Sequence, residues 1–361
     1  MRGLNSTIAR LAKLRVAAND GGHRDEKLRE LKTFGANPGN LRALTYVPGT
    51  LGSGPALVVV LHGCTQTAGD YDRGSGWSEL ADRHGFALLY PEQKRSNNAN
   101  LCFNWFSAAD ARRGKGEARS IREMVRHMVD TGQVDPARVF VTGLSAGGAM
   151  AAVMLAAYPD VFAGGAIIAG LPFATADSLP EALERMRGSG TPSEAELARL
   201  VAAGSPKVGE PPILSVWHGR VDHVVAPSNG VDIVTQWRAL HGVGEAPSRV
   251  ETVDGHLSRT WTNASGRAVI EHYEVAGMGH GVPLKTRGDE GVGQAGPHMF
   301  ETTISSTRHI ADSWGLLGTE RLLSKPRAEA PAEPRRHAAP TPDSGVKDVI
   351  ENALRSAGLM R

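Results

Sequence analysis

The sequence predicts an α/β fold in which helices cover both faces of a mainly parallel, doubly wound sheet. Short, continuous apolar runs recur along the chain, and such runs are typical of strands that are buried on both faces. They alternate with segments of helical periodicity, which is the order that a parallel sheet requires. The chain has 361 residues, which is enough for one large domain and additional segments.

The first half of the chain alternates regularly between strands and helices. Strands are predicted over 41–47, 57–61, 86–90, 139–142 and 166–169. Helices are predicted over 77–84, 121–129 and 149–157. The last of these helices is rich in alanine, which indicates burial, and Pro159 ends it.

The second half continues this order around a less apolar stretch. A strand is predicted over 213–217, a helix over 231–240, late strands or a hairpin within 249–275, and a closing helix over 300–316. Residues 174–211 are richer in Pro, Gly, Ser and charged residues. This composition predicts an insertion, and we expect an insertion at this point to cap an active site.

The ends of the chain differ from the predicted main domain, 41–318. Residues 1–40 are expected to hold an amphipathic helix and a linker, because their Leu and Ile residues share one helical face. Residues 324–345 are dominated by Pro, Ala and Arg and predict a disordered linker. Residues 346–361 predict a second amphipathic helix. Both terminal helices are interpreted either as packed on their own domain or as contacts with a granule or a partner.

Composition and charge exclude several classes of protein. The 40 Lys and Arg residues nearly balance the 38 Asp and Glu residues, so the net charge of +2 predicts no attraction to nucleic acid and favours a neutral or weakly charged substrate. No apolar run approaches the roughly 20 residues of a transmembrane segment, and no secretory signal is recognised at the N-terminus. Only two cysteines occur, which excludes a disulfide-built scaffold and a cysteine-rich metal site.

The pattern Gly-Leu-Ser-Ala-Gly at 143–147 carries the strongest chemical signal. It follows a predicted strand and precedes a predicted helix, which is the context of a nucleophile elbow, where glycines allow a tight turn that exposes the serine hydroxyl. The pattern predicts an α/β-hydrolase catalytic domain over 41–318 with Ser145 as the nucleophile of a serine esterase. The alternative is an ordinary glycine-rich turn.

A serine nucleophile requires a base and an acid that orients the base. His280 is the predicted base, because it lies in a glycine-rich loop after the last predicted strand. Asp222 is the predicted acid, because it follows the strand 213–217 and satisfies the chain order Ser, Asp, His. Asp254 is the alternative if Asp222 is only a solvated loop residue.

Acyl transfer also requires two backbone N–H groups directed at the developing oxyanion. Ala146, directly after the nucleophile, is predicted to supply one. The loop after the strand 57–61 is predicted to supply the other from Cys64, whereas His62 and Gly63 are alternatively interpreted as residues that shape the turn. This chemistry needs no metal and no organic cofactor.

These motifs together resemble the esterases related to polyhydroxybutyrate depolymerase, which are neighbours of feruloyl and acetylxylan esterases. The resemblance covers about 41–316. It rests on the run Leu61 to Gln66, on Asn104, Trp105 and Phe106, on the elbow at Ser145, on His218 and Gly219 with Asp222, and on Gly279 with His280.

The resemblance implies a substrate, a binding wall and a covalent link. The implied substrate is a short-chain poly- or oligo(3-hydroxyalkanoate), such as polyhydroxybutyrate, with Trp105, Gln66 and His62 as substrate-binding residues. It also implies a disulfide between Cys64 and Cys102, for which two free buried thiols are the alternative. Such a bridge would require an oxidising compartment.

The sequence also departs from the secreted members of this family, which carry a signal peptide and a polymer-binding domain. The absence of both indicates a cytoplasmic protein, whereas the resemblance implies an extracellular one. Soluble oligomers or amorphous granules therefore fit better than crystalline polymer. The alternative functions are a feruloyl or acetylxylan carbohydrate esterase and a non-catalytic protein that binds granules or a partner.

Overall fold

The computed structural model describes residues 27–52, 54–204 and 209–318, all of them within one compact unit. The predicted terminal helices and the predicted linker 324–345 lie outside the described residues. Within the described ranges, no helix has the length and apolar character needed to cross a membrane.

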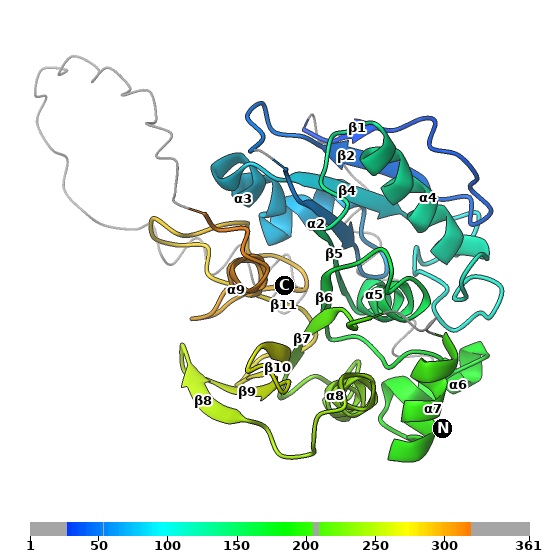
Figure 1. The fold of residues 1–361 in the computed structure, drawn as a ribbon, viewed down its shortest axis with the longest axis vertical. Coiled ribbons are helices and arrows are strands. Elements are labelled where there is room, and N and C mark those ends of the chain that lie inside the picture. The colour runs from blue at the N-terminus through cyan, green and yellow to red at the C-terminus, as the bar shows by residue number, and fades with distance from the viewer. Residues whose placement is uncertain (1–26, 53, 205–208, 319–361) are drawn as a thin grey trace, which may run out of the picture. The chain divides into compact units, whose positions relative to one another are not determined.

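A ten-stranded sheet forms the centre of the fold (Figure 1). Its strands are β1 (Arg29–Glu30), β2 (Arg42–Tyr46), β3 (Leu57–Leu61), β4 (Ala87–Glu92), β5 (Val139–Leu144), β6 (Gly164–Ile168), β7 (Ile213–Gly219), β8 (Arg249–Val253), β9 (His256–Thr262) and β10 (Ala268–Val275). Their order across the sheet is β1-β2-β4-β3-β5-β6-β7-β10-β9-β8. The six strands from β4 to β10 in this order run parallel, and antiparallel pairs form both edges. The predicted α/β-hydrolase fold class is confirmed.

Helices cover both faces of this sheet, as the continuous apolar strands predict. The helices are α2 (Ala68–Ser75), α3 (Trp77–His84), α4 (Gly116–Asp130), α5 (Ala146–Ala157), α6 (Leu179–Met186), α7 (Glu194–Gly204), α8 (Ser228–His241) and α9 (Ser306–Ser313). Figure 1 shows α2, α3 and α9 on one side of the sheet and α4, α5 and α8 on the other.

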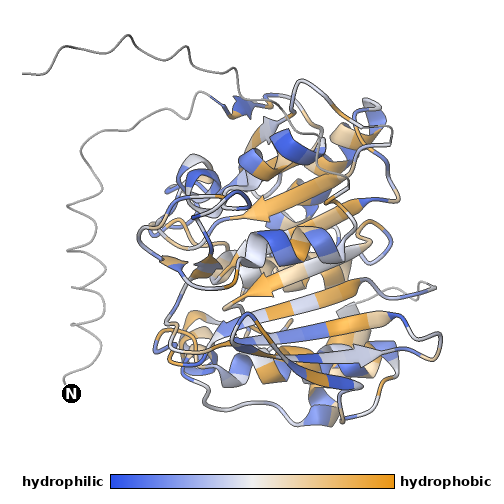
Figure 2. Ribbon diagram, turned by 90° about the vertical axis from the view of Figure 1, so that its left-hand side faces the viewer, coloured by the Kyte–Doolittle hydropathy of each residue, from blue (hydrophilic) through white to orange (hydrophobic). Residues whose placement is uncertain are grey.

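The two apolar cores follow from the alternation of side chains along each strand. In β3, Leu57, Val59 and Leu61 belong to the core under α4 and α5, whereas Val58 and Val60 belong to the core under α3 and α9. All five side chains are at most 1% exposed. Figure 2 shows the central strands largely in the hydrophobic colours, in agreement with this burial on both faces.

The sheet begins before the predicted domain boundary at residue 41. Strand β1 lies inside the segment 1–40, which the sequence predicts as a helix and a linker, and it pairs with β2. Leu28 and Phe34 are buried, so burial of these two side chains extends the domain toward the N-terminus.

The predicted closing helix over 300–316 is wrong in its first part. Residues Met299–Glu301 form β12, which pairs in parallel with β11 (Val282–Leu284). Helix α9 begins only after Ser305, whose hydroxyl accepts a hydrogen bond from the N–H of Arg308. This N-cap sets the start of the helix.

The predicted insertion 174–211 contains α6 and α7. Helix α7 packs against α8 and α5, and Leu197 and Val201 are its buried residues. The end of α6 contacts the segment that follows Asp222, because the N–H of Ala226 donates to the carbonyl of Met186 at 2.7 Å. The predicted role of this insertion as a cap stays a prediction.

Candidate active site

Ser145 lies on a strained turn between β5 and α5. Its backbone has φ 58° and ψ −119°, a conformation that costs a non-glycine residue energy. A Cβ on Gly147 would lie 2.3 Å from the carbonyl oxygen of Leu61, and a Cβ on Gly143 would lie 2.4 Å from the carbonyl oxygen of Gly147. Both glycines are therefore required by close packing of the backbone. This is the geometry of a nucleophile elbow.

Asp222 and His280 are joined by a hydrogen bond at the carboxyl ends of β7 and β10, which are neighbours in the sheet. His280 Nδ1 donates to Asp222 Oδ2 at 2.7 Å. The other oxygen, Oδ1, accepts from the N–H groups of Val224 and Val225 at 2.8 and 2.9 Å. The carboxylate is thus held on both oxygens.

The charge of Asp222 follows from a balance of opposing effects. Burial by itself raises the pKa of the carboxyl, but hydrogen bonds from His218 and His280 outweigh it, so the pKa of Asp222 lies well below its usual range. The group is an anion at neutral pH. An anion bound to Nδ1 leaves Nε2 of His280 as the nitrogen for proton transfer.

The structure brings Asp222 and His280 together but forms no hydrogen bond between His280 and Ser145. The hydroxyl of Ser145 bonds to no other residue in the described part of the chain. Catalytic hydrogen bonds are often long without substrate and shorten in the complex. Asp254, the alternative acid, lies between β8 and β9 and is instead 3.3 Å from His309 Nε2.

The loop 62–66, called the oxyanion loop after the predicted role of Cys64, packs against the elbow. A Cβ on Gly63 would lie 3.5 Å from the carbonyl oxygen of Leu144, the residue before Ser145. No hydrogen bond within the described ranges uses the N–H of Cys64. The N–H of Ala146 belongs to the first turn of α5, where backbone donors have no partner inside the helix.

A disulfide joins the oxyanion loop to a second loop, 98–106. Cys64 and Cys102 form this bond, with their Cα atoms 4.3 Å apart. The N–H of Thr65 also donates to the carbonyl of Asn100 at 2.7 Å. The oxyanion loop is therefore tied to the loop that carries Trp105.

Removing the disulfide is expected to lower both stability and activity. Cys102→Ala opens a link across 38 residues, so we expect a loss of roughly 2–4 kcal/mol in the free energy of unfolding. We also expect kcat to fall, because the N–H of Cys64 loses its anchor. Urea unfolding and initial rates, each compared with the oxidised wild type, check this, and the reduced wild type should behave like the variant. Unchanged values would contradict the anchoring role.

The three predicted substrate-binding residues occupy different environments. His62 is 1% exposed; its Nδ1 donates to the carbonyl of Gly63 at 2.8 Å and its Nε2 accepts from the N–H of Gln93 at 3.1 Å. The side-chain oxygen of Gln66 accepts a hydrogen bond from the N–H of Gly63 at 2.8 Å. These contacts favour the alternative that His62 and Gly63 shape the turn. Trp105 is 6% exposed, with its ring 5.6 Å from that of Phe106.

His62 is neutral in this site. Burial lowers its pKa, and the donor at Nδ1 with the acceptor at Nε2 matches one neutral tautomer. The ring also packs on Phe103 at a centroid distance of 5.0 Å.

Two buried residues were not among the catalytic or binding residues that the sequence predicts. His218 Nε2 lies 2.9 Å from the carbonyl oxygen of Val225 and 3.5 Å from Asp222 Oδ2; its position four residues before Asp222 was the available signal. Glu117 is 1% exposed and accepts hydrogen bonds from Asn104 and Gln93. A glutamate in the first turn of an amphipathic helix is ordinarily a solvated residue, so no sequence signal marked it.

Glu117 is expected to make stability depend on pH. Burial raises the pKa of Glu117 from 4.5 to about 7, so the fold favours the neutral carboxyl. Its stabilising contribution is complete below pH 4.5 and is lost as the pH rises through 7. The free energy of unfolding of the wild type minus that of Glu117→Gln should fall by on the order of 3 kcal/mol between pH 4.5 and 8. Urea unfolding across this range measures it, and a constant difference would refute it.

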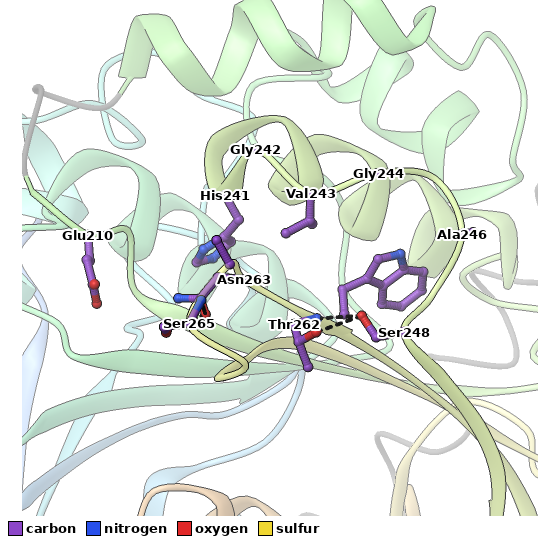
Figure 3. A pocket seen from close by; sticks show the side chains of 12 residues that line it. Glu210, His241, Gly242, Val243, Gly244, Ala246, Ser248, Thr262, Asn263 and Ser265 are labelled. Atoms are coloured by element: carbon purple, nitrogen blue, oxygen red, sulfur yellow. Dashed lines mark hydrogen bonds between the residues drawn. The ribbon is translucent and has the colours of Figure 1, made fainter.

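A cavity of about 570 Å³ lies away from these residues (Figure 3). It is lined by Glu210, His241, Gly242, Val243, Gly244, Ala246, Ser248, Trp261, Thr262, Asn263, Ala264 and Ser265. Glu210 precedes β7, whereas Asp222 follows it, so the cavity is at the opposite end of this strand. None of the predicted site residues lines it.

Comparison with known proteins identifies the family. Residues 41–254 match the family described as Esterase PHB depolymerase. The chain is 42% identical over 293 residues to poly(3-hydroxyalkanoate) depolymerase C of Paucimonas lemoignei, with 81% of this chain and 70% of the relative covered. It is 34% identical over 274 residues to acetylxylan esterase A of Aspergillus oryzae, with 73% and 86% covered.

Two further comparisons agree. The chain is 32% identical over 265 residues to feruloyl esterase B of Talaromyces funiculosus, with 71% of this chain and 73% of the relative covered. A solved structure of acetyl xylan esterase from Aspergillus awamori matches with a TM-score of 0.65 and 28% identity, covering 70% of this chain and 93% of that one. The chain belongs to the Esterase PHB depolymerase family and is a carboxylic ester hydrolase.

Proposed function

We propose that this esterase acts through a Ser145–His280–Asp222 triad with an oxyanion hole formed by the N–H groups of Cys64 and Ala146. The hydrogen bond between His280 and Asp222 carries this proposal. It orients one imidazole at the carboxyl edge of the sheet, on the same edge as the strained turn of Ser145.

The reaction then proceeds through an acyl-enzyme. His280 Nε2 takes the proton of Ser145 Oγ as the oxygen attacks the ester carbonyl. The two N–H groups stabilise the oxyanion of the tetrahedral intermediate. His280 returns the proton to the leaving alcohol, and then activates a water that releases the acid and frees Ser145. Asp222 stabilises the imidazolium that forms in both halves.

We propose that the substrate is a short-chain oligo- or poly(3-hydroxyalkanoate). The support is the 42% identity to a depolymerase over 81% of the chain, against 32–34% to the carbohydrate esterases over 71–73%. The near-neutral net charge of the chain is compatible with an uncharged polyester. The granule contact expected of the terminal segments stays a prediction.

An acetylxylan esterase is the second candidate. It is favoured by the likeness to the solved Aspergillus awamori enzyme, 93% of which is covered at a TM-score of 0.65. The same triad would serve a sugar acetate, so the substrate has to be decided by assay.

Matched assays separate the candidates. Purified wild type and Ser145→Ala are compared on nitrophenyl acetate, soluble 3-hydroxybutyrate oligomers, acetylated xylan and methyl ferulate, with product release quantified. We expect the wild type to be fastest on the oligomers and the variant to be inactive on every ester. Hydrolysis confined to acetylated xylan or ferulate would overturn the substrate, and activity of the variant would overturn the triad.

A further inference from the structure

A buried carboxylate bonds to one loop of the proposed site and to Gln93, which contacts the other loop. Glu117 is in the first turn of α4, with only 1% of its surface exposed. Among the described residues, no ion pair involves it. A buried carboxylate without a cation is costly unless hydrogen bonds replace its hydration, so its partners indicate what it holds.

Glu117 accepts hydrogen bonds from three N–H groups. Oε2 accepts from the backbone N–H of Asn104 at 2.8 Å. Oε1 accepts from the side-chain amides of Asn104 at 2.7 Å and Gln93 at 2.6 Å. Asn104 directly precedes Trp105, so the carboxylate fixes the backbone of the loop 98–106 next to the ring that is predicted to bind substrate.

Gln93 extends this network to the oxyanion loop by two routes. Its backbone N–H donates to His62 Nε2 at 3.1 Å, and His62 Nδ1 donates to the carbonyl of Gly63 at 2.8 Å. Its side-chain amide also donates to the carbonyl of Cys102 at 3.1 Å, and Cys102 is bonded to Cys64. The first route ends at the carbonyl of Gly63, which shares a peptide unit with the N–H that we assign to the oxyanion hole, and the second ends at the side chain of Cys64.

We propose that Glu117 is a positioning residue for ester hydrolysis, which holds the oxyanion loop and the loop 98–106 in register through Gln93 and Asn104. This inference rests on the proposed function. Only a carboxylate offers two oxygens that accept without presenting a donor. An amide in the same place would direct an N–H at one of the three donors.

Glu117→Gln therefore tests this role, because it keeps the size of the side chain and replaces one accepting oxygen with a donor. At pH 8 the wild-type group is ionised, because burial raises its pKa to about 7. We expect kcat for nitrophenyl acetate to fall about 10- to 100-fold, since small displacements of oxyanion donors reduce rates by such factors. KM should change by less than about threefold.

Glu123→Gln is the matched control on the same helix. Glu123 is also buried, but it pairs with Arg122 and Arg126 rather than with either loop. We expect its kcat to stay within about twofold of wild type, even where its melting temperature falls. Rates are expressed per active site, titrated with a fluorophosphonate, so that misfolded protein does not count.

A second variant tests the connection between the loops. Gln93→Leu removes the link from Glu117 toward Cys102. If both residues act through one network, the double variant is about as slow as the slower single variant, whereas independent effects would multiply. Multiplying losses, or an unchanged kcat per titrated site in Glu117→Gln, would overturn the positioning role. An inactive wild type would overturn the proposed function and this inference together.

Discussion

Ser145→Ala is expected to reduce kcat/KM on the preferred ester by at least about 10⁴-fold, because no other hydroxyl lies on the strained turn that precedes α5. Losses of this size or larger follow removal of the nucleophile from a triad. The fold should be retained, since the Ser145 hydroxyl bonds to no other described residue and alanine keeps the same Cβ. Initial rates and thermal melting measure the two effects.

Ser145→Gly sharpens this experiment by separating strain from chemistry. Glycine adopts φ 58° and ψ −119° at little cost, so removal of the Cβ should release part of the roughly 1–3 kcal/mol that such a conformation costs. We expect Ser145→Gly to be inactive and to melt above Ser145→Ala. Equal melting temperatures would limit the stored strain to the roughly 0.5–1 kcal/mol by which the freedom of glycine in the unfolded chain offsets it. Residual activity in both variants would point to another nucleophile.

Asp222→Asn is expected to reduce kcat by about 10⁴-fold. An amide that faces Nδ1 of His280 stabilises the wrong tautomer and no longer stabilises the imidazolium. KM should change much less, because the carboxylate is 3% exposed and is engaged by His280 and the backbone. Steady-state kinetics over a series of substrate concentrations separate kcat from KM.

Asp254→Asn is the control for this prediction, because Asp254 is the alternative acid considered for the triad. Its carboxylate lies beside His309 rather than His280, so its replacement should leave kcat within about twofold. A large loss in Asp254→Asn together with a small one in Asp222→Asn would reverse the assignment of the acid.

The elements that the sequence predicts best are those that depend on residues close to them in the chain. Strand β3 and helix α3 coincide with the predicted ranges 57–61 and 77–84, because an uninterrupted apolar run and a capped helix depend on neighbouring residues. The elbow at Ser145 is similarly local, since two glycines and the flanking elements determine it. The strained turn that carries the proposed nucleophile is therefore predictable from the sequence alone.

The elements that the sequence misses depend on distant partners. Strand β12 forms by pairing with β11, and β1 by pairing with β2, so neither is visible in its own few residues. Glu117 is a similar case, because its burial comes from loops that lie 13 and 24 residues away along the chain.

By itself, the sequence determined the class of the fold, the family resemblance and the turn that carries the proposed nucleophile, because these follow from periodicity and from short motifs. Only the tertiary structure decided which aspartate meets His280, what His62 binds, and how the two cysteine-bearing loops are connected. Hydrogen bonds and the disulfide join residues far apart in the chain, and their geometry exists only once the sheet has brought the ends of its strands together.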